Sequence, residues 1–160
     1  MNVRALAVVL VCVLLSACDA GRTPTGGAPA AAPSEPSFQD FGDFEVHYNA
    51  LRSDELGADV ARAYGIERSA NRVMLNVSLL AKSPEGRTRP VDGTVTASAY
   101  NLNGQLKSLE LRRVTEGPAV YFIGEVGITG NEILVFDIDA RPAGRDSAYH
   151  VQFKREFFAD

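Results

Sequence analysis

The sequence is poor in the side chains that cross-link small exported domains through disulfides or that bind metals. Its 160 residues include no tryptophan, two cysteines (Cys12 and Cys18) and two histidines (His47 and His150). An antibody-type sandwich packs a tryptophan against a disulfide, so that core is excluded. A zinc site takes three or four His, Cys or carboxylate ligands, and the two histidines lie about a hundred residues apart. We therefore predict no metal site of this kind.

Catalytic motifs are also missing. No Gly-x-Ser-x-Gly elbow is present, and Ser53, Ser69 and Ser78 occupy predicted cap, turn and strand positions. Gly124 and Gly127 lie within a strand pattern, whereas a phosphate-binding loop would open a helix. The sequence predicts a protein that is not an enzyme and has no cofactor. A hydrolase with an unrecognised site is one alternative.

Positive charge is in the minority. Lys and Arg number 16 against 20 Asp and Glu, the formal net charge is −4, and no basic run occurs. Nucleic acids and anionic lipid surfaces attract basic patches. We therefore exclude nucleic acid as a partner, and we expect no electrostatic attraction to lipid headgroups.

No long apolar run predicts a membrane-spanning helix, which needs about 20 residues. The apolar run from Ala5 to Leu15 has 11 residues, follows Arg4 and leads into small residues and a cysteine, as export signals do. The string Leu15-Ser-Ala-Cys18 resembles the lipobox of bacterial lipoproteins. That resemblance implies a signal peptide over residues 1–17, cleavage before Cys18, and lipid on the sulfur and new amino group of Cys18. The alternative is a plain secretory signal.

A lipidated Cys18 would hold the mature protein at a membrane, because each buried methylene contributes about 0.8 kcal/mol. Asp19 follows the cysteine and resembles the inner-membrane retention signal of enteric lipoproteins. It favours the inner membrane slightly, with the outer membrane as the alternative. We predict a lipid-anchored protein of the cell envelope that faces the periplasm and, since Cys12 leaves with the signal, lacks disulfides.

Residues 18–37 form a distinct segment after the signal. Residues 19–37 contain four prolines, three glycines and no aromatic or large aliphatic side chain. Such a segment buries too little apolar area to offset its ordering entropy. We predict a disordered tether over residues 18–37 and a folded domain over residues 38–160.

Alternating apolar and polar residues dominate the folded part, and this period of two is typical of half-buried strands. Seven such strands are predicted, beginning near residues 44, 73, 90, 105, 120, 134 and 149. Ser53 and Gly65 delimit a short helical insertion after the first strand, and Asn103-Gly104 favours a tight hairpin with a type I′ turn. The prediction is an all-β, antiparallel, immunoglobulin- or fibronectin-like seven-stranded β-sandwich. A small barrel is the alternative.

Three strings carry a resemblance to a known family: Phe41-Gly-Asp-Phe-Glu-Val-His-Tyr-Asn-Ala50, Ala61-Arg-Ala-Tyr-Gly-Ile-Glu-Arg-Ser-Ala-Asn-Arg72 and Asn101-Leu-Asn-Gly-Gln-Leu106. From about Phe41 to Phe158 the chain resembles a bacterial exported family catalogued as domain of unknown function 4426. The resemblance supports the fold and an exported location. It implies no activity and no catalytic residues.

One polar cluster is the candidate binding site. It joins the outward face of the first strand to the insertion and the following turn, and consists of His47, Asn49, Tyr64, Arg68, Asn71 and Arg72. Tyr and Arg are frequent anchors at interfaces, and an Arg fork binds carboxylates. In the alternative interpretation these side chains only tie the insertion to the sandwich through hydrogen bonds to its backbone.

Two weaker metal hypotheses remain. Asp43, Glu45 and His47 share one strand face, and Asp137 and Asp139 could join Asp146 or Glu132 around calcium. For both sets we favour solvated polar faces without metal.

The leading functional prediction is a membrane-tethered, non-enzymatic binding or assembly module. Its partner would be an unknown envelope protein or polymer, engaged by a sheet edge or by the insertion. The alternative is a sensor domain that binds a small ligand or a metal through the polar cluster.

Overall fold

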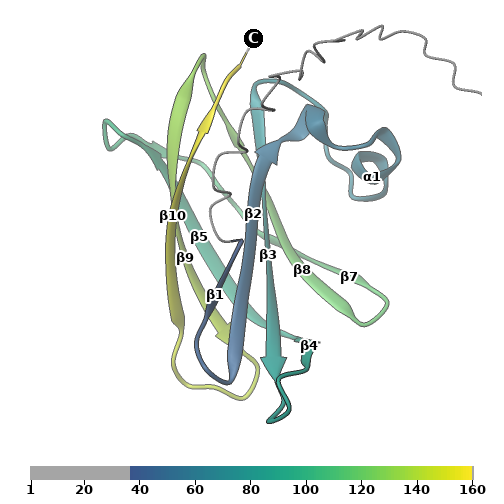
Figure 1. The fold of residues 1–160 in the computed structure, drawn as a ribbon. Helices are drawn as coiled ribbons and strands as arrows, with labels where there is room; N and C mark the ends of the chain where they lie inside the picture. Colours follow the sequence, from purple (N-terminus) through teal and green to yellow (C-terminus); the bar gives the residue numbers. More distant parts are fainter. Residues whose placement is uncertain (1–36, 160) are drawn as a thin grey trace, which may run out of the picture. The chain divides into compact units, whose positions relative to one another are not determined.

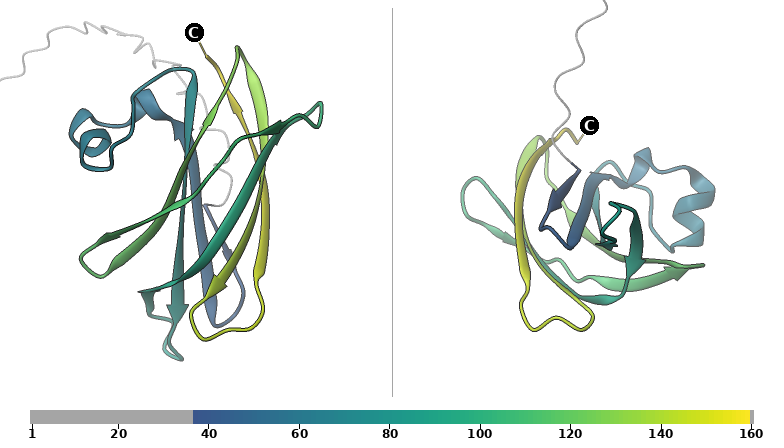
Figure 2. Two further views of the ribbon diagram at one scale, coloured as in Figure 1. Left: turned by 180° about the vertical axis from the view of Figure 1, so that it is seen from behind. Right: turned by 60° about the horizontal axis from the view of Figure 1, so that its bottom comes forward.

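The computed structural model describes residues 37–159, which form two antiparallel sheets (Figure 1). Sheet A contains β1 (Phe38–Asp40), β2 (Phe44–Arg52), β3 (Arg72–Lys82), β8 (Ala119–Gly127) and β7 (Arg112–Glu116) in that spatial order, with β4 (Thr88–Val91) paired to the end of β3. Sheet B contains β10 (Tyr149–Phe157), β9 (Glu132–Pro142), β5 (Gly93–Asn101) and β6 (Leu106–Lys107). Figure 2 shows the two layers from other directions.

The main core lies between the two sheets, because the apolar residues of each strand recur with a period of two. Leu75 and Leu79 of sheet A face Leu134, Phe136 and Ile138 of sheet B, and all of these are fully buried. Burying one such side chain is worth roughly 1.5–3 kcal/mol. This contiguous core stabilises the domain without the disulfides that small exported domains often use.

A helical insertion separates β2 from β3 and packs on the outer face of sheet A, away from sheet B (Figures 1 and 2). It contains the 3₁₀ turn η1 (Ser53–Glu55) and the helix α1 (Ala58–Ala63). Gly65, with φ of +62°, ends the helix in the left-handed conformation. Ala61 and Ile66 of the insertion are buried against Met74 and Ile123 of sheet A. A second, smaller apolar cluster therefore lies outside the sandwich.

The insertion is fixed to the sheet by a buried serine. The Ser53 hydroxyl lies 2.7 Å from the carbonyl oxygen of Glu67 and accepts a hydrogen bond from the Ser69 N–H at 2.9 Å. Ser53 is fully buried. The end of η1 is thereby tied to the segment that leads into β3.

The chain crosses from sheet A to sheet B at Gly93. A Cβ at this position would overlap the carbonyl oxygen of Arg141 and lie 2.6 Å from Cδ1 of Leu79. Only glycine therefore allows β4 to end and β5 to begin against β9 here.

The predicted fold class is confirmed: the domain is an antiparallel two-sheet β-sandwich with a short helix after its first long strand. The barrel alternative is wrong, because no strand of the described part pairs across the two sheets. The described residues contain ten strands instead of seven. The short edge strands β1 and β7 were missed, and the predicted third strand is divided into β4 and β5 at Asp92.

The predicted type I′ turn is also wrong. The loop between β5 and β6 has its tip at Leu102, Asn103 and Gly104, and the Gly104 N–H donates to the carbonyl oxygen of Asn101 at 2.9 Å. The Asn101 carboxamide accepts the N–H groups of Asn103 and Gln105 at 3.1 and 3.0 Å. This side chain organises a longer loop than the Asn-Gly pair alone predicts.

The predicted signal peptide, Cys18 and nearly all of the tether lie outside the described residues and stay predictions. Within residues 37–159, no helix has the length and apolar character needed to cross a bilayer.

Candidate functional site

The outer face of sheet A carries two adjoining hollows that share Asn49 and Asn76. The first, of about 250 Å³, lies under the insertion and is lined by Asn49, Leu51, Leu56, Val60, Tyr64, Met74, Asn76, Tyr121 and Ile123. The second, of about 350 Å³, lies next to it and is lined by Ser37, His47, Tyr48, Asn49, Asn76 and Ser78. We call the two together the outer hollow, with an apolar end and a polar end.

The strand register builds this hollow. Asn49 of β2 lies opposite Asn76 of β3, and Asn76 lies opposite Ile123 of β8. One step along, Leu51 lies opposite Met74. Since alternate residues of a strand share a face, these outward positions form a continuous floor.

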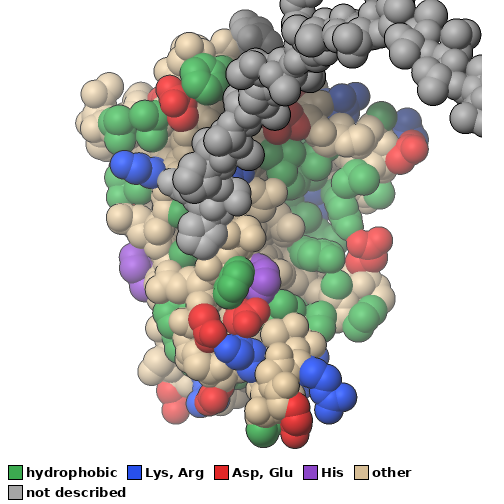
Figure 3. Space-filling model, in the orientation of Figure 1, with side chains coloured by type: hydrophobic (Ala, Val, Ile, Leu, Met, Phe, Trp, Pro, Cys, Tyr) green, Lys and Arg blue, Asp and Glu red, His purple; other side chains and the backbone are tan. Residues whose placement is uncertain are grey.

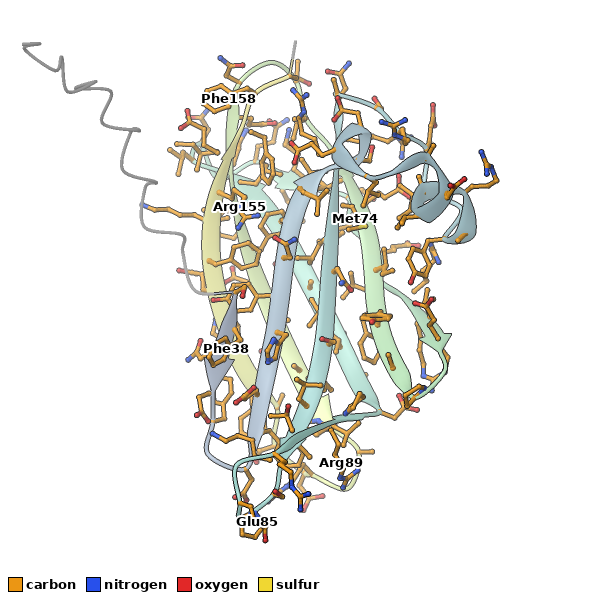
Figure 4. All side chains as sticks on the ribbon, turned by 45° about the vertical axis from the view of Figure 1, so that its right-hand side comes forward. Phe38, Met74, Glu85, Arg89, Arg155 and Phe158 are labelled. Carbon is orange, nitrogen blue, oxygen red and sulfur yellow. The ribbon has the colours of Figure 1, made fainter. Side chains whose placement is uncertain are left out.

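The insertion supplies one wall of the apolar end through Leu56, Val60 and Tyr64. Figure 4 shows Met74 beside the insertion, and Figure 3 shows hydrophobic side chains gathered on the right of the view, below α1. The Tyr64 hydroxyl donates to Oε2 of Glu116 at 2.5 Å. This hydrogen bond, together with burial, raises the pKa of Tyr64 above its ordinary value, so the hydroxyl keeps its proton.

Asn76 lines both ends of the hollow and has one unpaired polar atom. Its Oδ1 is buried and has no hydrogen-bond partner among the described residues. By contrast, Oδ1 of Asn49 accepts a hydrogen bond from Nη1 of Arg155 at 2.8 Å. A buried acceptor left unpaired costs about 1–3 kcal/mol, so such atoms call for an explanation.

The structure brings together half of the predicted polar cluster. His47, Asn49 and Tyr64 all line the outer hollow. Nε2 of His47 lies 2.8 Å from Oε2 of Glu45, and the ring of Phe38 stacks on the imidazole with 5.1 Å between centroids. These contacts hold the imidazole in place at the polar end.

Arg68, Asn71 and Arg72 lie away from the hollow. Arg68 Nη2 donates to the carbonyl oxygen of Asp54 at 2.6 Å, and the Asn71 carbonyl oxygen accepts the Ile128 N–H at 2.9 Å. Arg72 is paired with Glu125 at 3.4 Å. Of these three side chains, Arg68 bonds to backbone within the insertion and Arg72 to a side chain of β8, while the Asn71 contact is made by its own backbone.

Several lining residues were not singled out from the sequence. The list is Leu51, Leu56, Val60, Met74, Asn76, Tyr121 and Ile123. A signal was present, because Met74, Tyr121 and Ile123 are large apolar residues at the outward positions of alternating strands. Large apolar residues at outward positions indicate that another part of the protein covers that face, here the insertion.

The residues of the first metal hypothesis are paired with other side chains. Asp43 binds Arg145 at 2.8 Å, while Glu45 binds His47. Lys82 lies 3.8 Å from Glu45. Within the described part of the chain, no three His, Cys, Asp or Glu side chains gather as they would around a metal ion.

The calcium set is likewise dispersed among other partners. Asp137 accepts a hydrogen bond from Gln152 at 2.8 Å, and Asp139 lies 3.1 Å from His150. Glu132 pairs with Lys107 at 2.8 Å.

These features define a disulfide-free β-sandwich with a helical cover on one outer face. The family model described as domain of unknown function (DUF4426) matches residues 38–160, and the chain belongs to this family. The predicted resemblance is thus confirmed. A comparison with curated proteins gives no match.

Solved structures place the fold among known ones. A DUF4426 family protein from Pseudomonas aeruginosa PAO1 is 38% identical, with a TM-score of 0.65 over 77% of this chain and 94% of that chain. FetP of uropathogenic Escherichia coli strain F11, isolated after expression in the periplasm, has 10% identity and a TM-score of 0.50 over 77% and 93%. A copper-bound FetP variant has 11% identity and a TM-score of 0.47 over 77% and 95%. The FetP likeness concerns the fold alone.

Proposed function

We propose that this protein is a non-enzymatic binding module of the bacterial envelope that engages its partner at the outer hollow. A lipid on Cys18 would hold it at a membrane, and residues 18–37 would give the domain reach on the periplasmic side. The unpaired Oδ1 of Asn76 carries the proposal. A partner that donates a hydrogen bond to the Asn76 amide, once the amide turns toward the hollow, removes a cost that the free domain bears.

The polar end is the place where the non-enzymatic assignment can be tested. Glu45 and His47 are paired, and Ser78 lies directly opposite His47 on β3. A serine nucleophile needs a hydrogen bond to its base, whereas Nε2 of His47 is paired with Glu45 at 2.8 Å. A chromogenic-substrate screen tests this: activity that disappears in His47→Ala would contradict the non-enzymatic assignment.

Site-specific photo-cross-linking tests the binding site. Replacing Val60, which lines the hollow and is 46% exposed, by p-benzoylphenylalanine in the full-length protein should give one dominant adduct in native envelopes. The same group at Glu85, an exposed turn residue at the far end of sheet A (Figure 4), is the control and should not give that adduct. Equal adducts at both positions, or none at Val60, would refute the site.

The small-ligand or metal-binding alternative uses the same hollow, with the Glu45–His47 pair at its polar end. Lys82 competes with a metal for Glu45, since its Nζ lies 3.8 Å from Oε1 of that carboxylate. Native mass spectrometry separates the alternatives, because a resident metal or small molecule appears as added mass on the purified protein. A protein partner leaves the mass of the purified chain unchanged.

A further inference from the structure

The lining of the outer hollow is mostly neutral, and the charged groups that adjoin it, Glu45, Glu116 and Arg155, are bonded to lining residues. Among residues 37–159, no Lys, Arg, Asp or Glu lines either end, although these residues make up 22% of the chain. An ion moved into such a site loses its hydration, and the charged groups beside the lining are already bonded to lining residues. Phosphates, sugar acids, fatty acids and free chain termini therefore fit poorly, and an uncharged ligand fits well.

The size of the apolar end suits one large side chain. A closed cavity of about 150 Å³ is large enough for benzene, and the apolar end has about 250 Å³ and opens to the surface. Leu51, Met74 and Ile123 provide its apolar contacts. A leucine or phenylalanine side chain would be covered there by the insertion and the sheet.

Asn76 stands where the two ends meet, because it lines both. Its Oδ1 lacks a donor in the described structure. A hydrocarbon alone would leave this acceptor unpaired. A peptide bond beside an apolar side chain supplies an N–H that can pair with the Asn76 amide once the amide turns toward the hollow, and carries no net charge.

We propose that the outer hollow binds an extended peptide segment of a partner protein, with a large apolar side chain in the apolar end and the adjoining backbone amide at Asn76. This inference rests on the proposed function, which it narrows to one class of ligand. His47, Asn49 and Ser78 at the polar end then face the next peptide unit, which lies about 3.3 Å further along an extended chain.

The methionine content provides a probe for this site. The chain has two methionines, Met1 and Met74, and removal of the signal peptide leaves Met74 alone. A ¹³C-methyl-methionine label on the full-length mature protein in nanodiscs should therefore give one resonance, from the apolar end of the hollow. The titrating probes are the capped peptide acetyl-Ala-Leu-Ala-Ala-amide and its analogues with Asp or Lys in place of Leu.

The leucine peptide should shift the Met74 methyl resonance saturably, and the Asp and Lys analogues should leave it unchanged. Asn76→Leu should weaken binding at least tenfold. Val60→Lys, at a half-exposed helix position that tolerates the change, should also weaken it. Arg62→Ala is the matched control, because Arg62 lies on the same helix, pairs only with Asp59 among its described hydrogen bonds, and does not line the hollow.

The outcomes separate this inference from the proposed function. If Val60 cross-links a partner but no peptide shifts Met74, the binding site stands and the peptide assignment is wrong. If hexanol shifts the resonance as strongly as the leucine peptide at equal concentration, the site is a small-molecule pocket and the assignment is again wrong. If neither cross-link nor shift occurs, both proposals fail.

Discussion

Two asparagines that differ in their hydrogen bonding should respond in opposite ways when each is replaced by leucine. Asn101, 9% exposed, donates to Oε1 of Glu132 at 2.9 Å and to Oε1 of Gln105 at 3.1 Å, and accepts two loop N–H groups. Asn76 has its Oδ1 buried without a partner in the described structure. The two substitutions remove the same chemical group, so their comparison shows how much its hydrogen bonds contribute.

The magnitudes follow from these contacts. Asn101→Leu removes hydrogen bonds worth about 1 kcal/mol each and leaves loop donors unpaired, so the free energy of unfolding should fall by about 3 kcal/mol. Asn76→Leu removes an unpaired acceptor that costs about 1–3 kcal/mol and adds an apolar side chain next to Met74 and Ile123. The free energy of unfolding should therefore rise by about 1 kcal/mol.

Urea unfolding followed by circular dichroism measures both changes. With a slope of about 2 kcal/mol per molar urea, the midpoint should rise by about 0.5 M for Asn76→Leu and fall by about 1.5 M for Asn101→Leu. If Asn76→Leu destabilises the domain as much as Asn101→Leu does, the Asn76 amide is already satisfied in the free protein. The free domain would then have no unpaired acceptor at Asn76, and the argument that the ligand donates a hydrogen bond there would fail.

Three further predictions concern the fold, the pH dependence and the anchor. Gly93→Ala should lower the free energy of unfolding by about 2–3 kcal/mol through steric overlap. Gly127→Ala places its new Cβ with nothing within 4 Å and should raise the free energy of unfolding by up to about 1 kcal/mol. Thermal melts of the two variants measure both changes. Although burial acts to raise it, the pKa of Glu132 is lowered overall by hydrogen bonds, chiefly from Lys107. The resulting stability is present above the unfolded pKa of about 4.3 and is lost as pH falls through the lower folded pKa. Glu132→Gln should abolish this acid dependence of the melting temperature between pH 3 and 6. An unchanged pH profile in the variant would contradict the prediction. Cys18→Ala should abolish metabolic labelling with a palmitate analogue and release the protein from membranes, and retained labelling would refute the lipobox assignment.

Local sequence patterns were sufficient for most of the fold. The alternation of Val46 and Tyr48 with polar neighbours predicts β2, because each residue's side of a strand depends only on its position along that strand. Ser53 and Gly65 likewise mark the limits of the insertion through capping and left-handed backbone conformation. The edge strands β1 and β7 were missed because they are mostly exposed and lack an apolar face.

The candidate site was predicted only in part. His47 and Asn49 could be identified as outward polar residues of one strand. Their association with Asn76 could not, since it depends on the register that pairs β2 with β3. Arg68 and Arg72 looked like binding residues, but their partners are a backbone carbonyl and Glu125, which lie near them only after folding.

The sequence by itself determined the family, the alternating strands, the position of the insertion and the prediction of an exported, lipid-anchored chain, because each depends on neighbouring residues or on a contiguous motif. Tertiary structure alone decided that the insertion folds back over sheet A and that three strands and a helix line one open hollow with mostly neutral side chains. It also decided that Asn76, chemically equivalent to Asn101 in the sequence, is left without a partner for its oxygen in the described structure. Hydrogen-bond satisfaction depends on which groups meet in space, and for these residues that is set by strand register and sheet packing.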